Sequence, residues 1–96
     1  MILTETTLKE IEELAGLFLE PEEIAILLDL DPGEFLNQVI MKNGSAYMAY
    51  FKGKTIAKKE IHQNVVKMAR HGSPQAEELA KEFMVKQSIA EKRAKK

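Results

Sequence analysis

The three prolines of this chain each stand where a helix is expected to begin, and this punctuation constrains the fold more than any other feature of the sequence. Asp31-Pro32 and Ser73-Pro74 place a capping side chain directly before proline, and Pro21 is followed by two glutamates. Proline is favoured at the first helical position because its missing N–H has no intrahelical partner there, and acids complement the positive end of the helix dipole. Each proline therefore predicts a helix start.

Between these starts, apolar residues recur at helical spacing and no strand pattern appears. Thr7 and Glu10 fit a capping box before the first helix, and Asn43-Gly44 and Gly72 fit helix ends. The sequence therefore predicts an all-α fold, a small bundle of about five helices that contains a helix-turn-helix. The expected helices cover residues 8–19, 21–28, 32–42, 45–71 and 74–86.

The length of 96 residues allows one compact domain and leaves no room for a second core. Residues 1–86 are expected to form a single helical domain. From residue 87 onward charges replace apolar residues, so residues 87–96 are expected to be a frayed tail. Gly53 interrupts the fourth helix and is expected to mark a kink or a close helix contact.

The chain lacks the residues that most catalytic and metal sites need. It has no cysteine, and His62 and His71 are too far apart to bind one metal ion from one helix face. Ser45 and Ser73 are explained as helix caps. We therefore expect no enzyme activity, no catalytic residue, no cofactor and no metal site. No secretory signal and no membrane-spanning run appear, so a cytoplasmic location is expected, with no membrane partner.

Opposite charges are separated along the chain, although the formal net charge is only −1. Residues 1–34 contain ten acids and one lysine, whereas the rest contains thirteen Lys and Arg against five Glu. A net charge near zero would argue against a nucleic-acid partner, but the separation leaves a basic region that could bind a polyanion.

Residues 21–42 have the register of a helix-turn-helix, in which a short helix and a second helix are joined by a tight turn. The positions that such a motif packs are occupied by Ile24, Ala25, Leu28, Leu30 and Phe35. Asp29 departs from the pattern because glycine is usual in the turn, and Gln38 stands where an apolar residue is expected. Any helical hairpin has similar spacing, so a packing role or an acidic protein-binding surface stays an alternative.

The second helix of this motif offers few groups for DNA. Asn37 or Gln38 could hydrogen-bond to adenine, and Lys42 adds a positive charge at the end of the helix. Asp31 and Glu34 at its start would repel phosphates. This helix is therefore expected to be a poor DNA reader by itself.

The stronger electrostatic candidate is the fourth helix, where lysines could neutralise phosphates and release counterions. These lysines are Lys52, Lys54, Lys58 and Lys59. A solvated helix face has the same appearance and is the alternative. The aromatic residues among the lysines are at core spacing, so they are expected to pack and not to stack on bases. The expected buried stripe is Tyr47, Tyr50, Phe51, Ala57, Ile61, Val65 and Met68.

Four segments carry a resemblance to a known family: residues 22–28 (EEIAILL), 46–50 (AYMAY), 51–54 (FKGK) and 66–76 (VKMARHGSPQA). In combination they resemble the helix-turn-helix region of phage or prophage terminase small subunits, over roughly residues 14–83. The resemblance implies a non-enzymatic subunit that recognises double-stranded viral DNA for packaging in the bacterial host cytoplasm. It also implies a homo-oligomer that works with a large terminase subunit. The chain departs from the family in its acidic second motif helix and its short C-terminal part.

Two other classes of protein fit the same residues. The first is a helical protein–protein adaptor, whose acidic N-terminal third docks on a basic partner or on the basic part of a second copy. The second is a dimeric helix-turn-helix transcriptional regulator.

Overall fold

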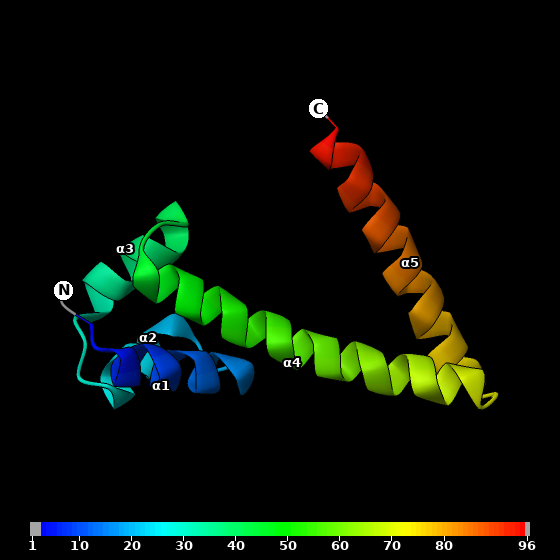
Figure 1. Cartoon of the computed structure of the whole chain (residues 1–96), viewed down its shortest axis with the longest axis horizontal. Helices are drawn as coiled ribbons and strands as arrows, with labels where there is room; N and C mark the ends of the chain where they lie inside the picture. Colours follow the sequence, from blue (N-terminus) through cyan, green and yellow to red (C-terminus); the bar gives the residue numbers. More distant parts are fainter. Residues whose placement is uncertain (1–2, 96) are drawn as a thin grey trace. The chain divides into compact units, whose positions relative to one another are not determined.

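A computed structural model describes residues 3–95, and within this range the chain forms five α-helices and no strand (Figure 1). The helices are α1 (Glu5–Gly16), α2 (Pro21–Leu27), α3 (Pro32–Met41), α4 (Ser45–Arg70) and α5 (Pro74–Ala94). The expectation of an all-α chain with five helices is confirmed.

The proline-marked helix starts are where the sequence predicts them. Asp31 Oδ1 accepts a hydrogen bond from the Glu34 N–H at 3.1 Å, and Ser73 Oγ accepts one from the Ala76 N–H at 3.3 Å. At the start of α2, the Glu20 N–H donates to Glu23 Oε1 at 2.9 Å. Each of these side-chain bonds satisfies a backbone group that the first helical turn leaves without a partner.

The first helix begins three residues earlier than predicted. Thr4, in an extended conformation, is its N-cap, and Thr4 Oγ1 accepts from the Thr7 N–H at 3.1 Å. Thr7 is already inside the helix, so the expected capping box of Thr7 and Glu10 is wrong. The helix also ends earlier, at Gly16, because Phe18 adopts a φ of +64° that no α-helix accommodates.

Helix α5 continues to Ala94 and so includes residues 87–94, for which the sequence predicts a frayed tail. The segment contains no proline or glycine, and most of its residues favour helix. Lys92 and Arg93 lie in the last turn, where positive charges complement the helix dipole.

The chain divides into two compact units, one up to Lys58 and one from Lys59 onward, whereas the sequence predicts a single domain over residues 1–86. The division falls within α4. Its physical reason is the distribution of buried side chains: the core cluster lies entirely between Ile11 and Ala49. Only α1, α2, α3 and the first part of α4 contribute to this core.

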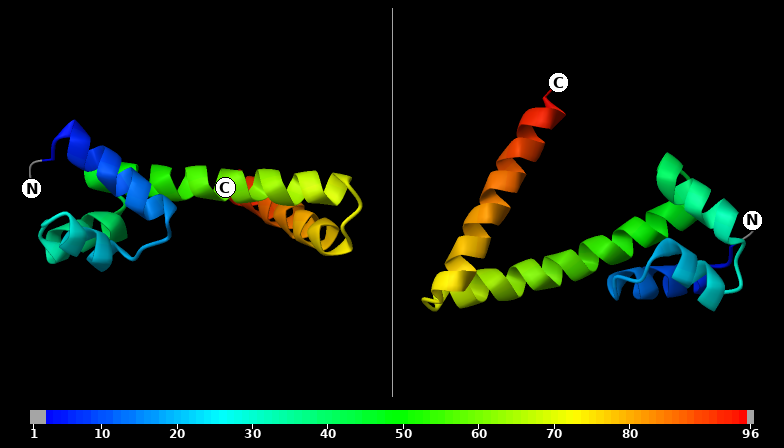
Figure 2. Two further views of the ribbon diagram at one scale, coloured as in Figure 1. Left: turned by 90° about the horizontal axis from the view of Figure 1, so that it is seen from below. Right: turned by 180° about the vertical axis from the view of Figure 1, so that it is seen from behind.

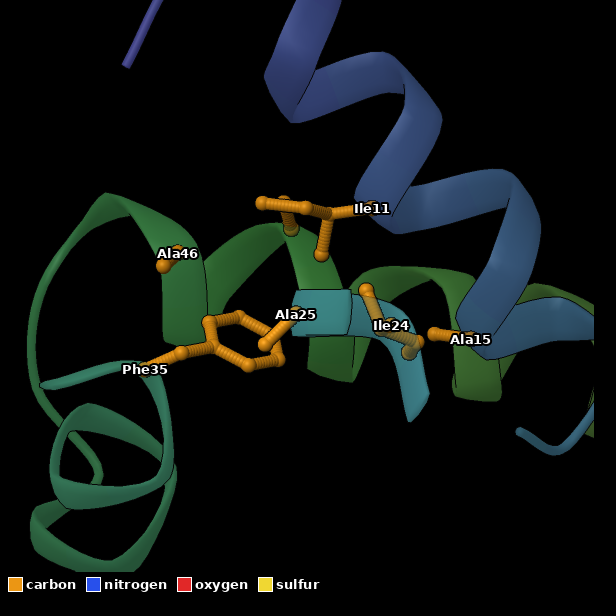
Figure 3. Packing of buried hydrophobic residues seen from close by; sticks show 7 residues of the cluster. Ile11, Ala15, Ile24, Ala25, Phe35 and Ala46 are labelled. Atoms are coloured by element: carbon orange, nitrogen blue, oxygen red, sulfur yellow. The ribbon is translucent and has the colours of Figure 1, made fainter. Parts of the chain in front are cut away.

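In the first unit, α1, α2 and α3 gather around the N-terminal part of α4 (Figure 2). The largest fully buried side chains are Phe35, Ile11 and Ile24, and Figure 3 shows them close together. The other core residues are small: Ala15, Ala25, Ala46 and Ala49. Alanine at these positions lets the helix backbones approach closely, since there is little side chain between them.

Helices α1 and α4 approach each other closely at Gly53. A Cβ atom added at Gly53 would collide with the backbone carbonyl of Glu12 in α1. On the α1 side, a Cβ atom added at Gly16 would lie 3.4 Å from the Gly53 carbonyl oxygen. Gly53 therefore marks a close helix contact, one of the two roles that the sequence predicts for it.

The buried stripe expected along α4 is wrong for three of its residues. Phe51, Ile61 and Met68 are 50%, 46% and 55% exposed. The residues of α4 that are buried in the first unit are the small ones, Ala46, Ala49 and Gly53. Because these small residues face the other helices, Phe51, two positions from both Ala49 and Gly53, is rotated outward by about 100° per residue. Ile61 and Met68 lie beyond this core, in the second unit.

The second unit is a pair of helices joined by a tight turn. Gly72 has a φ of +94°, and the Gly72 and Ser73 N–H groups donate to the carbonyls of Ala69 and Met68 at 3.0 and 3.1 Å. These two bonds close α4 in the way typical of a glycine-terminated helix. Across the pair, the His62 and Phe83 rings stack with centroids 3.6 Å apart and planes within 5° of parallel.

Candidate nucleic-acid interface

The helix pair α2 and α3 has the short turn that the sequence predicts. The Leu30 N–H donates to the Ala25 carbonyl at 2.8 Å, and Asp29 has a φ of +55°. Aspartate is one of the few residues other than glycine that enter this left-handed region at low cost. Asp29 therefore replaces the usual glycine without opening the turn.

The predicted packing positions of this motif face inward. Ile24, Ala25 and Phe35 are fully buried, and Leu28 and Leu30 are half-buried against the core. The two helices are thus held by the same residues that the sequence assigns to them.

The polar candidates on α3 differ in their accessibility. Asn37 is exposed, whereas Gln38 is half-buried and its Oε1 atom is buried without a hydrogen-bond partner. A Cβ atom added at Gly44 would meet this oxygen, so the Gln38 side chain lies against the loop after α3. Lys42 is exposed at the end of α3, with a φ of +53°. Asn37 and Lys42 are therefore better placed than Gln38 to reach a base or a phosphate.

The structure brings together only part of the lysine group predicted on α4. Lys54 and Lys58 are exposed and lie one turn apart on the same face of the helix. Lys52 is also exposed, but it lies about 200° from Lys54 around the helix axis, at about 100° per residue. Lys59 is exposed and belongs to the second unit.

Two aromatic residues share the face of Lys54 and Lys58. Tyr47, Phe51, Lys54 and Lys58 follow one another at intervals of four, three and four residues, and we call this set the aromatic–basic strip. The Tyr47 and Phe51 rings stack with centroids 5.7 Å apart and an interplanar angle of 22°. Phe51 is half exposed, so the prediction that it packs in the core is wrong. The spacing of the strip was visible in the sequence, but the aromatic residues had been assigned to the buried side.

The strip is connected to the core through Tyr50. The Lys54 Nζ atom lies 5.4 Å from the centroid of the Tyr50 ring, within the range of a cation–π contact. Tyr50 in turn meets Phe35 edge to face, with centroids 6.2 Å apart. Lys54 is therefore positioned by a side chain that packs on the largest residue of the core.

Burial raises the pKa of the Tyr50 hydroxyl above its ordinary value of 10.0. A raised folded-state pKa means that the unfolded chain loses this proton first as the pH rises. Tyr50 thus contributes stability that is present below about pH 10 and is lost as the pH rises through the folded-state pKa. We expect the wild type to lose more free energy of unfolding between pH 7 and about pH 10.5 than Tyr50→Phe does, in urea titrations.

The matched control is Tyr47→Phe, which removes a hydroxyl from another tyrosine of the same helix. It should keep the alkaline loss of the wild type. Equal losses in the wild type and in Tyr50→Phe would contradict the inference from burial.

The lysines of α4 in the first unit, and Lys42 before it, are not neutralised by acids in the described part of the chain. Lys42, Lys52, Lys54 and Lys58 form no ion pair with an acid among residues 3–95. This holds although the first unit contains ten acids against five lysines. The positive charges of α4 are therefore available to an external polyanion.

Within residues 3–95, no group of three or more His, Asp or Glu side chains is arranged to hold a metal ion. None of the helices in this range is long and apolar enough to cross a membrane.

Comparison of this chain with protein families, with characterised proteins and with solved structures finds no match.

Proposed function

We propose that this chain is a non-enzymatic protein that binds double-stranded DNA through α4. The observation that carries the proposal is the aromatic–basic strip, in which half-buried Tyr47 and half-exposed Phe51 are followed on the same helix face by two exposed lysines. These lysines form no ion pair with an acid among residues 3–95. Lys52 and Lys42 add positive charge in the same unit, and Asn37 offers an amide for a base edge.

The chemistry of the strip suits a duplex. Each lysine that neutralises a phosphate releases condensed counterions, which favours binding at low salt. The accessible parts of the Tyr47 and Phe51 rings can pack on deoxyribose and on thymine methyl groups beside the phosphates. Asp31 and Glu34 at the start of α3 repel phosphates. We therefore assign the main DNA contact to α4 and a secondary contact to α3.

The finer proposal is a terminase small subunit-like protein that selects viral DNA for packaging in the cytoplasm of a bacterial host. The four segments quoted above support it, as does the short turn between α2 and α3. In such a protein several copies form a homo-oligomer, and weak contacts of single copies add by avidity. A large terminase subunit would be the second partner.

The test is the salt dependence of duplex-DNA affinity for the triple variant K52Q/K54Q/K58Q. We expect the wild type to bind duplex DNA at low salt, with an affinity that falls steeply as salt increases. Removing the two strip contacts should reduce the slope of log affinity against log salt by about 1.8, at about 0.9 per contact, and Lys52 on the other side of the helix should add at most about 0.9.

The matched control is K9Q/K81Q/K92Q, which removes the same charge from exposed positions outside the strip. Its slope should be close to that of the wild type. No binding by the wild type at low salt would refute the proposal, and equal effects of the two triple variants would reduce it to non-specific attraction by net charge.

The adaptor alternative is favoured by one observation in the acidic N-terminal part of the chain. Leu17, Phe18, Ile26 and Leu27 are exposed near the acids of α1 and α2. If this surface carries the function, charge reversal at Glu13, Glu22 and Glu23 should abolish assembly without unfolding the chain. The mass of the assembly by light scattering separates the other two classes, because a dimer favours the transcriptional regulator and a larger ring the packaging subunit.

A further inference from the structure

The second unit contains an open groove along α4 that the proposed function does not use. Its volume is about 680 Å³, which is within the range of pockets that hold small ligands. Val66 and the aliphatic parts of the other side chains give the groove much apolar surface, and the other lining residues are cationic or polar, namely Lys59, His62, Gln63, Lys67, Arg70 and His71. No acid lines it.

The charge of the groove is not balanced by its surroundings. Lys59, Lys67 and Arg70 form no ion pair with an acid among residues 3–95. The second unit as a whole contains nine Lys and Arg against five Glu, the reverse of the balance in the first unit. An anion that enters the groove would therefore meet three positive charges that have no competing partner in this part of the chain.

A simpler role for these cations would be to stabilise the C-terminal end of α4, where positive charge is favourable. Backbone hydrogen bonds already satisfy several of the carbonyl groups at that end of α4. The carbonyls of Lys67, Met68 and Ala69 accept hydrogen bonds from the N–H groups of His71, Ser73 and Gly72. The side chains of Lys67 and Arg70 are thus not required to bond these carbonyls and are free to reach a ligand.

One wall of the groove is fixed in place. The His62 ring stacks on Phe83 of α5 at 3.6 Å, so one face of the imidazole is covered and its edge remains beside Lys59 and Gln63. Arg70 adds a planar guanidinium that can bind two phosphate oxygens at once, and Lys67 adds a point charge three residues before it. Together these groups match a phosphodiester better than a single carboxylate.

We propose that this groove is a second binding site for the phosphodiester backbone of duplex DNA, with Arg70 and Lys67 as the main contacts and Lys59, His62 and Gln63 beside them. This inference rests on the proposed function, because it assigns a further contact surface to the same ligand. It implies that both units of the chain bind DNA, each with its own set of cations.

The experiment is a duplex-DNA titration of the full-length chain at several salt concentrations, with the variant K67Q/R70Q. We expect the slope of log affinity against log salt to fall by about 1.8, at about 0.9 per phosphate contact. The control K81Q/K86Q removes two exposed charges from α5 outside the groove lining and should keep the wild-type slope.

A second variant keeps the test decisive if K67Q/R70Q is poorly folded. Gln63→Glu is nearly isosteric and places a negative charge in the groove, so it should weaken DNA binding while circular dichroism shows unchanged helix content. Unchanged affinity and slope in a folded Gln63→Glu chain would overturn the inference.

The outcomes also separate this inference from the proposed function. If the wild type binds DNA and K52Q/K54Q/K58Q weakens it, but K67Q/R70Q and Gln63→Glu do not, the groove is not a DNA site and the proposed function stands. If the wild type does not bind DNA at low salt, both fail.

A second experiment is a titration with inorganic phosphate, monitored through the amide chemical shifts of residues 59–71. Saturable phosphate binding in the groove without any effect of its variants on DNA affinity would assign it to a small phosphate ligand and overturn the inference.

Discussion

Replacing Phe35 by alanine should lower the free energy of unfolding by about 3–5 kcal/mol, the usual cost of deleting a fully buried phenyl ring. Phe35 has no exposed surface and lies between Ala25 of α2 and the first residues of α4 (Figure 3). It also supplies the edge-to-face contact with Tyr50, which positions Lys54. Because this core has only two other large, fully buried side chains, the cavity cannot be filled easily by a neighbour. Urea unfolding followed by far-ultraviolet circular dichroism measures the change.

The matched control is Phe51→Ala, which deletes the same ring from a half-exposed position on α4. It should cost well under half as much, since Phe51 buries less surface and leaves no closed cavity. A cost at Phe51 equal to that at Phe35 would show that Phe51 is buried in solution, for example in an interface between copies.

Replacing Gly53 by alanine should destabilise the first unit by about 1–3 kcal/mol or more, the range for overpacking a tight contact. In an ordinary helix the same change is favourable by about 0.5–1 kcal/mol, because alanine loses less conformational freedom than glycine. Here the added methyl group collides with the backbone carbonyl of Glu12, which cannot rotate away as a side chain could. Helix α1 would have to move off α4, and the contacts of Ile11 and Ala15 with the core would weaken.

Gly33→Ala is the control for this change. Gly33 lies in α3, and a Cβ atom added there would meet only the Asp31 carboxylate at 3.4 Å, an ordinary contact distance. Thermal unfolding should therefore show Gly33→Ala at or slightly above the wild-type midpoint, and Gly53→Ala clearly below it. If Gly53→Ala were as stable as Gly33→Ala, the two helices would be farther apart than the structure places them.

The helix starts could be predicted from the sequence because they depend on few neighbouring residues. Asp31 and Ser73 each bond a backbone N–H three residues later, and the following proline reinforces the same boundary. The start of α1 was missed because Thr4 and Thr7 are both plausible caps, and the sequence pattern favoured the one with a glutamate three residues later.

The burial pattern of α4 could not be predicted in the same way. Apolar residues lie on several sides of this helix, so hydrophobic periodicity does not identify the buried face. The buried face is formed by Ala46, Ala49 and Gly53, whose small size matters because another backbone lies against them. That contact joins residues about forty positions apart, which local patterns do not report.

Only part of the candidate site could be predicted, because it too depends on which face of α4 is buried. The charges of Lys54 and Lys58 are evident in the sequence, whereas the exposure of Phe51 beside them depends on which face of α4 is buried. The groove in the second unit is lined by residues of α4 and His71, and the stacking of Phe83 on His62 depends on the turn at Gly72. Its cations were counted in the sequence, but their gathering around one cavity required the structure.

The small residues at the centre of the first unit have a consequence for how relatives of this protein can diverge. Positions 15, 25, 46, 49 and 53 accept little more than glycine, alanine or serine, so the scaffold should drift slowly there. The outer face of α4 is under less steric restriction, since Phe51, Lys54 and Lys58 are exposed and Tyr47 is only half-buried. Lineages could therefore exchange the residues at positions 47, 51, 54 and 58, and with them the preferred ligand, while keeping the same arrangement of helices beneath.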